Sequence, residues 1–345
     1  MVNHTNAFLE KQKRRREEEA LKRKKREEEG FNNGLRKARA AKNDEFFTQS
    51  YDIEKELSNY SHHFKGKTVL CNCNDSQHTG FKDYFVENFN AFGLKRLICT
   101  GYKVDGQHGD VYEYDGNEEK TSILSGNGSF DSEECIRLLN KSDIVVTNPP
   151  FSLFRQFLSL LVEHDKVFLI IGNLNAVAYK EVFPLMRDNL IWMGETQFYG
   201  GTAYFIAPME LYDASKMSKK ANGQIDENGN FIWRVNGVRW FTNMHNRKRD
   251  KELVLTCKYE PDKYPKYDNY DAINVDKVLE IPNDYDGLMG VPVSFMDKYC
   301  PEQFEIIGLM TGAQDKAFIN GNDGRTKFFV NGKSVYARIL IKKKR

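Results

Sequence analysis

From about residue 45 onward, short apolar runs alternate with amphipathic stretches, and this alternation limits the fold more than any other feature. Short apolar runs separated by helical patterns are typical of strands that are buried on both faces and joined by crossover helices. The runs at 67–72 and 95–100 flank a helical pattern at 81–92, which predicts one βαβ unit. The sequence therefore predicts an α/β fold built on a doubly wound parallel sheet.

The same alternation continues to about residue 194. It predicts further strands at 111–114, 143–147, 166–171 and 191–194, and helices at 132–140, 153–161 and 179–189. Beyond about residue 200, short β-like segments are separated by turns rich in Gly and Asn. Three dipeptides there predict hairpins: Asn222-Gly223, Asn228-Gly229 and Asn236-Gly237.

These changes in pattern predict three regions. Residues 1–43 form a charged helical extension, 44–200 a cofactor-binding and catalytic domain, and 201–345 a β-rich region for target recognition that also closes the sheet. The first 45 residues hold 14 Lys or Arg against 9 Asp or Glu, and the chain ends in four basic residues. This extension is equally consistent with a basic arm near nucleic acid and with a solvated helix that binds nothing.

No stretch of the sequence resembles a membrane span or a secretory signal. The longest apolar run, Val167–Ile171, is too short to cross a bilayer, and no apolar core follows the N-terminus. We therefore expect a soluble, cytoplasmic protein with no membrane partner.

The cysteines are scattered without a CxxC pair, which argues against a disulfide framework and a four-ligand zinc site. Cys71 and Cys73 could be grouped with His62, His63 and His78 as metal ligands, but their spacing is irregular. Buried strand cysteines are the favoured interpretation, and no metal is expected.

The strongest local signal is Asn148-Pro149-Pro150-Phe151, directly after the predicted strand at 143–147. In open α/β sheets, ligands bind beyond the carboxyl ends of the strands. Two prolines make a rigid turn that lacks two N–H donors, so it presents oxygen acceptors. The Asn148 amide oxygen and the Pro149 carbonyl can accept the two hydrogens of a planar amino group and align its lone pair for attack.

This geometry predicts direct methyl transfer from a sulfonium to the N6 amino group of adenine. Asn148 stabilises the positive charge that develops on nitrogen, and Phe151 stacks on a base rotated out of the duplex. The alternative is a strand-ending turn that caps the next helix. The preceding α/β half favours the catalytic interpretation.

The chain resembles the EcoRI-type adenine-specific DNA methyltransferases from about residue 43 to the C-terminus. The matching stretches are DEFFTQSYDIEKEL at 44–57, VTNPPFSLFRQF at 146–157, FLIIGN at 168–173, WFTNMHNRKR at 240–249 and MGVPVSFMDKYCPEQFEIIG at 289–308. The resemblance implies a Rossmann-like sheet that binds S-adenosylmethionine in its first half and acts on double-stranded DNA.

What the resemblance implies for the cofactor is a site formed by an N-terminal segment and the turn after the first strand. That turn, at 72–75, departs from the glycine-rich pattern usual in methyltransferases, and Ser129 stands where many of them carry Asp. The implied cofactor-binding residues are Phe46, Phe47, Thr48, Gln49, Asn74, Asp75, Ser129 and Phe130.

DNA contacts are expected from aromatic and basic side chains of the later half. Aromatic rings can wall a flipped base, although core packing is the commoner role for each of them, and a basic cluster can contact phosphates. The candidates are Tyr199, Trp240, Arg247, Lys248 and Arg249.

Together these features predict a DNA adenine N6-methyltransferase. Cytosine N4, adenine in RNA and a glutamine amide remain alternative acceptors, because the same turn suits any planar amino group. A DNA-binding protein that retains the fold but lacks cofactor binding is the alternative from another class.

Overall fold

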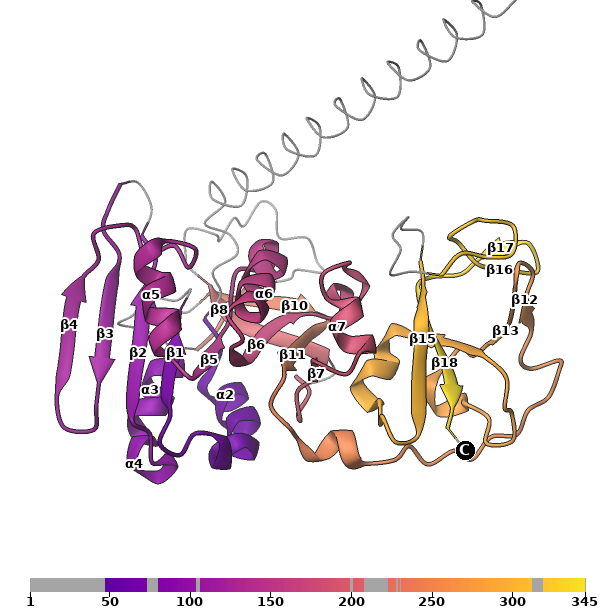
Figure 1. Ribbon diagram of the computed structural model, residues 1–345, viewed down its shortest axis with the longest axis horizontal. Coiled ribbons are helices and arrows are strands. Elements are labelled where there is room, and N and C mark those ends of the chain that lie inside the picture. The colour runs from indigo at the N-terminus through magenta and orange to yellow at the C-terminus, as the bar shows by residue number, and fades with distance from the viewer. Residues whose placement is uncertain are drawn as a thin grey trace, which may run out of the picture. The chain divides into compact units, whose positions relative to one another are not determined.

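The computed structural model describes residues 47–72, 80–103, 106–198, 201–207, 223–227, 229, 231–311 and 319–344 (Figure 1). Contacts divide the chain into Met1–Asp44 and Glu45–Arg345. The charged helix predicted for 1–43 lies outside the described residues. All that follows concerns the second unit.

The largest sheet in the described part has eight strands in the order β4-β3-β2-β1-β5-β6-β11-β7. Strands β2, β1, β5 and β6 are parallel, whereas β3 and β11 are antiparallel to their central neighbours. The bounds are β1 Thr68–Cys71, β2 Arg96–Gly101, β3 Asp110–Tyr114, β4 Glu119–Ile123, β5 Ile144–Thr147, β6 Val167–Asn173, β7 Trp192–Met193 and β11 Val238–Thr242.

The α/β class is therefore confirmed, but the prediction of a parallel sheet holds only for the centre. The segment between β2 and β3 is too short for a crossover helix, so these strands pair antiparallel and extend into the hairpin β3–β4. The added strand β4 (Glu119–Ile123) is polar and mostly exposed, which is why no apolar run predicted it.

Each central strand is buried on both faces, because consecutive side chains enter different cores. Leu70 and Val145 belong to one apolar core, and Val69 and Ile144 belong to the other. The helical elements are α2 Ser50–Leu57, η1 Ser58–His63, α3 Gly80–Glu87, α4 Phe89–Phe92, α5 Glu133–Lys141, η2 Phe151–Leu153, α6 Phe154–Glu163, η3 Leu174–Ala178, α7 Phe183–Arg187, η6 Arg247–Asp250, η7 Val278–Glu280 and η8 Val293–Lys298.

A three-stranded antiparallel sheet, β8-β10-β9, follows the first half of the chain. It comprises β8 (Thr202–Ala207), β9 (Gly223–Ile225) and β10 (Phe231–Asn236). Gly229 takes a φ of 80° in the turn between β9 and β10, which confirms that hairpin. Asn222 lies outside the described residues.

The hairpin predicted at Asn236-Gly237 is wrong. Gly237 does adopt a left-handed φ of 74°, but β10 pairs with β8 and β9 whereas β11 pairs with β6 and β7. The turn therefore passes the chain from the small sheet to the central one. β11 is buried along its whole length, and this burial favours insertion between two buried strands.

The last third of the chain forms a five-stranded sheet in the order β12-β13-β14-β18-β15, with a short hairpin β16–β17 beside it. One apolar core runs continuously from central-sheet residues such as Val145 to C-terminal residues such as Phe304 and Ile341. The bounds are β12 Lys266–Tyr267, β13 Tyr270–Asn274, β14 Met289–Pro292, β15 Phe304–Met310, β16 Phe329–Val330, β17 Lys333–Ser334 and β18 Arg338–Lys343.

A buried ion pair joins the two parts of this core. Arg239 of β11 donates to both carboxylate oxygens of Asp297 in η8, at 2.8 and 2.9 Å, and the two side chains are only 9% and 5% exposed. The two-pronged geometry satisfies both buried groups. Among the described residues, no helix is long and apolar enough to span a membrane.

We expect Asp297→Ala to lower the free energy of unfolding by about 3 kcal/mol or more, because it leaves the Arg239 guanidinium buried without its counterion. The double variant Arg239→Met, Asp297→Leu should recover most of that loss, since no charge is then stranded. Urea unfolding of the single and double variants measures both values. Additive losses would contradict this account of the pair.

Candidate active site

The order of the central strands creates a crevice between β1 and β5. From β1 the chain passes through α3 to β2 on one side, and β5 then pairs on the other side of β1. Ligands of open α/β sheets bind at such a reversal, beyond the carboxyl ends of the strands. Asn148 to Phe151 follow β5 at that edge, so the predicted catalytic turn stands where the fold places a ligand.

A buried hydrogen bond links the two strand ends. The Thr147 hydroxyl at the end of β5 donates to the backbone carbonyl of Asn72 after β1. Asn148 and Pro149 are buried, whereas Pro150 and Phe151 are half-buried. The turn continues directly into η2 and α6, because the Leu153 N–H donates to the Pro150 carbonyl at 2.9 Å.

The small sheet brings the predicted cofactor segment to the catalytic turn. Phe47 exchanges two backbone hydrogen bonds with Ile206 of β8, at 2.9 and 3.0 Å. The Gln49 side chain donates to the Tyr204 carbonyl at 2.5 Å. On the same strand, the Phe205 ring lies 6.1 Å from the Phe151 ring, centroid to centroid. Strand β8 therefore contacts both the Phe47 segment and the turn at Phe151, although about a hundred residues separate these two segments in the sequence.

Several buried polar atoms near this edge lack a hydrogen-bond partner among the described residues. They include Thr48 Oγ1, Asn72 Oδ1 and Asp110 Oδ1. Buried polar groups are normally paired, so such atoms mark places where a polar ligand fits. Thr48 is 6% exposed, and its carbonyl would lie 3.0 Å from a Cβ placed on Gly80. Gly80 thus allows the start of α3 to approach Thr48 closely.

Asp110 was not predicted from the sequence. It opens β3 opposite Gly101, the last residue of β2, and so lies at the carboxyl edge beside the crevice. The sequence signal was weak, because an acid before a strand-like VYEY segment usually marks only the strand's start. Only the pairing of β3 with β2 shows that Asp110 lies at this edge.

The loop that carries Ser129 also lies at the carboxyl end of β2. The Lys103 N–H donates to the Asn127 carbonyl at 2.9 Å, and a Cβ on Gly128 would collide with the Gly101 carbonyl. The Ser129 hydroxyl donates to Asp131 and keeps its lone pairs as acceptors. Phe130 instead packs edge-on against Phe157 at 5.1 Å, as part of the core.

Four predicted residues fall outside the described part of the chain: Phe46, Asn74, Asp75 and Tyr199. Trp240 is described, and it is no wall for a flipped base. Its side chain is 1% exposed and stacks on Phe198, with the ring centroids 5.7 Å apart. The alternative of core packing is therefore correct for Trp240, because β11 is buried on both faces.

The basic cluster is not brought to the catalytic turn. Strand β11 is antiparallel to β6, so the residues that follow β11 lie at the opposite edge of the sheet. Lys248 donates to the Gly194 carbonyl at 3.1 Å, and burial lowers the pKa of its ammonium group. The Arg249 guanidinium stacks 3.5 Å above the Trp192 ring. Arg247 alone of the three is exposed.

Lys248 and Arg249 thus have partners within the protein, and contact of either residue with phosphates stays a prediction. The sequence showed a run of basic residues but not their neighbours. Because the segment is a single 3₁₀ turn, its side chains diverge, and two of the three find internal partners.

A buried carboxylate fixes the connection between α2 and the small sheet. Glu56 is fully buried and accepts hydrogen bonds from the Tyr60 hydroxyl at 2.9 Å, from the Glu195 N–H at 2.8 Å, and from the backbone and hydroxyl of Thr196 at 2.7 and 2.5 Å. Helix α2 follows the Thr48 segment directly, and Thr196 lies shortly before β8. Glu56 therefore ties the end of α2 to the segment between β7 and β8.

Comparison with known proteins identifies the group to which this site belongs. The family described as adenine-specific methyltransferase EcoRI matches residues 34–344. The chain belongs to this family. It is 45% identical over 335 residues to the type II methyltransferase M.EcoRI of Escherichia coli, and the match covers 91% of this chain and 97% of that one. No solved structure matches the chain significantly.

Two mycoplasma proteins match the chain over a similar share of its length. The chain is 40% identical to type II methyltransferase M.MpnI of Mycoplasma pneumoniae and 39% identical to M.MgeORF184P of Mycoplasma genitalium, over 90% of its length in each case. The match covers 98% of each relative, so the β-rich region is shared as well as the central sheet.

The buried carboxyl group of Glu56 should make the stability of the protein depend on pH. Burial, which outweighs its hydrogen bonds, raises the pKa of the Glu56 carboxyl. A raised folded-state pKa means that the contribution to stability is present below the unfolded pKa and is lost as pH rises through the folded one. Between about pH 5 and pH 8, we expect wild type to lose stability relative to Glu56→Gln, which does not titrate there.

Urea unfolding at the two pH values measures this difference. The control is Glu54→Gln, on the same helix, whose side chain is exposed. Its stability should run parallel to that of wild type. If the stability difference between Glu56→Gln and wild type were equally large at both pH values, the raised pKa of Glu56 would be refuted.

Proposed function

We propose that this protein transfers a methyl group from S-adenosylmethionine to N6 of adenine in double-stranded DNA, and that its central sheet is a Rossmann-like methyltransferase sheet. The observation that carries the proposal is the placement of Asn148-Pro149-Pro150-Phe151 at the strand-order reversal, in a chain of an adenine-specific methyltransferase family. The type II names of the relatives place the reaction in restriction and modification.

The donor set at the carboxyl edge fits S-adenosylmethionine. A hydroxyl at Thr48, an amide at Asn72 and a carboxylate at Asp110 each have a buried oxygen there that finds no partner among the residues that the structure describes. A carboxylate at this position of an α/β sheet suits ribose hydroxyls. When bound, the cofactor supplies a methyl group on a positively charged sulfur, which needs no further activation by a metal.

The catalytic turn orients the acceptor. We assign the Asn148 side-chain oxygen and the Pro149 carbonyl as acceptors for the two N6 hydrogens, which leaves the nitrogen lone pair directed at the methyl group. Burial of this turn strengthens both interactions, because water does not compete there. The Asn148 oxygen also stabilises the positive charge that forms on nitrogen during transfer.

An aromatic surface continues from the turn. Phe205 contacts Phe151, and Trp233 pairs with Phe205 across β10 and β8, so both lie on one face of the small sheet. We propose that Phe151 stacks on the flipped adenine and that Trp233 borders the same space. This assigns to Trp233 the role that sequence analysis gave to Trp240.

Other planar amino groups, in cytosine, RNA or a glutamine amide, meet the same acceptor geometry, but the adenine specificity of the family favours adenine. A binding protein without cofactor affinity is the alternative from another class. The buried oxygens at Thr48, Asn72 and Asp110, which lack partners within the described part of the chain, favour a protein that binds the cofactor.

The first test is transfer of labelled methyl groups to unmethylated genomic DNA, with the labelled nucleoside identified by mass spectrometry. Asn148→Ala should reduce the transfer rate about 10²–10³-fold, because it removes one acceptor at the reacting nitrogen. Asn88→Ala removes a part-buried amide that bonds only within the α3–α4 corner and should leave the rate unchanged. Label in another nucleoside would show that adenine is not the substrate. A transfer rate for Asn148→Ala within a few-fold of the wild-type rate would contradict the acceptor role of Asn148.

A second test concerns the link between β1 and β5. Thr147→Val removes the donor to the Asn72 carbonyl, and we expect a stability loss of about 1–3 kcal/mol together with a smaller thermal shift on adding S-adenosylmethionine. Thr242→Val is the matched control, because that buried hydroxyl donates to the Phe168 carbonyl at the opposite edge. The control should lose comparable stability yet keep the full thermal shift. Equal shifts in the two variants would contradict a cofactor site at this edge.

A further inference from the structure

The segment from 319 to 337 carries a tight hairpin at the end of the C-terminal sheet. β16 (Phe329–Val330) and β17 (Lys333–Ser334) are joined by Asn331 and Gly332, which have φ values of 51° and 73°. Two successive left-handed residues match a two-residue turn of the twisted type that hairpins favour. The local sequence therefore favours this turn, and Val330 packs against a small apolar cluster that includes Phe328.

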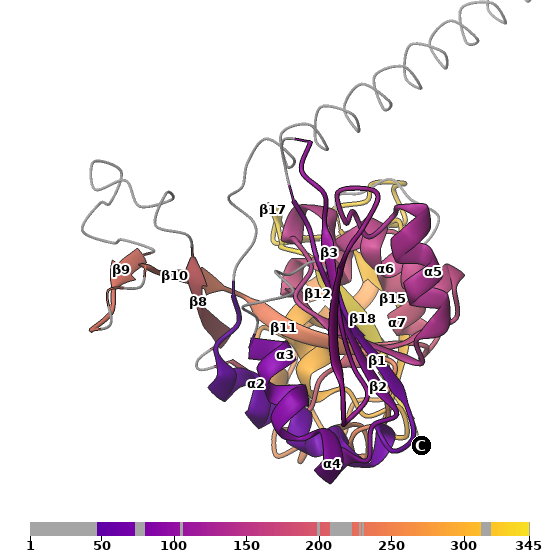
Figure 2. The ribbon, with the colours of Figure 1, turned by 90° about the vertical axis from the view of Figure 1, so that its left-hand side faces the viewer.

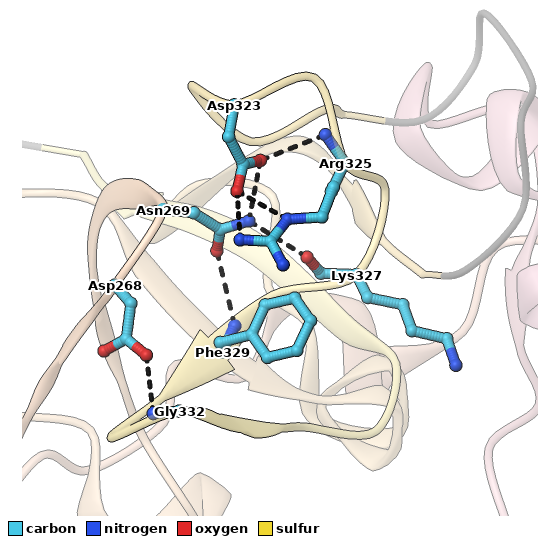
Figure 3. A network of polar contacts seen from close by, with 7 residues as sticks. All are labelled: Asp268, Asn269, Asp323, Arg325, Lys327, Phe329 and Gly332. Atoms are coloured by element: carbon cyan, nitrogen blue, oxygen red, sulfur yellow. Dashed lines mark hydrogen bonds and ion pairs between the residues drawn. The ribbon is translucent and has the colours of Figure 1, made fainter.

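The hairpin is held by side chains from the β12–β13 turn (Figure 3). The Asp268 carboxylate accepts the backbone N–H groups of Asn331 and Gly332 at 3.1 and 2.7 Å. The Asn269 side chain donates to Asp323 and to the Lys327 carbonyl, both at 3.1 Å, and accepts the Phe329 N–H at 3.3 Å. The loop is thus preorganised by contacts on its inner side.

Arg325 belongs to this scaffold. Its Nε donates to Asp323 at 2.6 Å, and its guanidinium lies 4.6 Å from the centre of the Phe329 ring. The hydrogen bonds from Arg325 lower the pKa of Asp323 to about 2, so this carboxylate stays ionised at neutral pH. The charges of Arg325 and Asp323 offset one another within the loop.

The outer side of the loop is basic and exposed. Between residues 326 and 337 the sequence contains two lysines and no acid. Lys327 and Lys333 are exposed, and Figure 3 shows the Lys327 side chain extending away from the network. Tyr336 is 90% exposed, more than any other large hydrophobic residue in the described part of the chain. Lys327, Ser334 and Tyr336 border a pocket of about 410 Å³.

This surface lies on the side of the molecule that carries the catalytic turn. In Figure 1, α4, which directly precedes β2, lies at the lower side, so the parallel strands point upward. The labels β16 and β17 stand at the upper side in Figure 1, and β17 does so again in Figure 2. The hairpin therefore lies on the side of the molecule to which the carboxyl ends of the parallel strands point.

We propose that the hairpin β16–β17, with Lys327 and Tyr336, is a surface that holds the duplex beside the target adenine. This inference rests on the proposed function. Lys327 and Lys333 contact phosphates, and Tyr336 packs against sugar and base edges. A two-stranded ribbon has the width of a DNA groove, and a rigid loop loses little entropy on binding.

The test measures binding of a short mixed-sequence duplex by fluorescence anisotropy at several salt concentrations. Each phosphate contact contributes about one to the slope of log affinity against log salt, so K327A/K333A should weaken binding and lower the slope by about two. Y336A should weaken binding about tenfold and leave the slope unchanged, because it removes an uncharged contact. All three side chains are exposed, so the variants should keep the wild-type unfolding temperature.

The matched control is K65A/K95A, which removes two exposed charges at the amino edge of the sheet. It should bind like wild type, or nearly so. Identical affinity and slope for K327A/K333A and K65A/K95A would overturn the inference, as would a wild type that binds no duplex. The wild type could instead bind the duplex, with the expected effects of the variants, but transfer no label. That result would overturn the proposed reaction and still support this DNA-binding surface.

Discussion

The parallel pairing of β1 with β5 is the constraint on which the site depends. These strands are distant in sequence, and the intervening chain makes β2, the β3–β4 hairpin and α5 before it returns. Because each strand is buried on both faces, its register against its neighbour is specified by packing. The carboxyl ends of β1 and β5 therefore end at one level, where Thr147 bonds to the Asn72 carbonyl. That pairing therefore sets the position of the turn from Asn148 to Phe151.

The second half of the chain completes the site. Strand β8 pairs with the Phe47 segment and contacts Phe151, and Glu56 secures the approach to β8 through Glu195 and Thr196. The chain then returns through Gly237 into β11, which is inserted between β6 and β7. The small sheet is thus tethered at both ends to the central one. This explains how a β-rich insertion can form a wall of a site whose chemistry belongs to the α/β half.

Charge in this protein is used in two ways. Lys248, Arg249 and Arg239 are all engaged internally, by a carbonyl, an aromatic ring and a carboxylate respectively. Lys327 and Lys333 are exposed on a loop whose polar scaffold faces inward. A basic run in the sequence therefore did not reveal which of its side chains have internal partners. The surface that we propose for the duplex instead carries isolated lysines on a hairpin.

Hydrophobic periodicity predicted the central strands, the βαβ unit and the position of the catalytic turn, because these depend on local patterns and on the burial of continuous apolar runs. Periodicity missed β4, whose exposed polar strand has no such signal, and it took Asn236-Gly237 for a hairpin. Asp110 and Trp233 also escaped sequence analysis, since each acquires its position from a partner strand. The sequence by itself determined the α/β class and placed Asn148 to Phe151 directly after a buried strand. Only the tertiary structure decided which aromatic side chains lie near that turn and which basic side chains stay exposed, because strand pairing between distant segments, and not sequence spacing, sets which residues become neighbours.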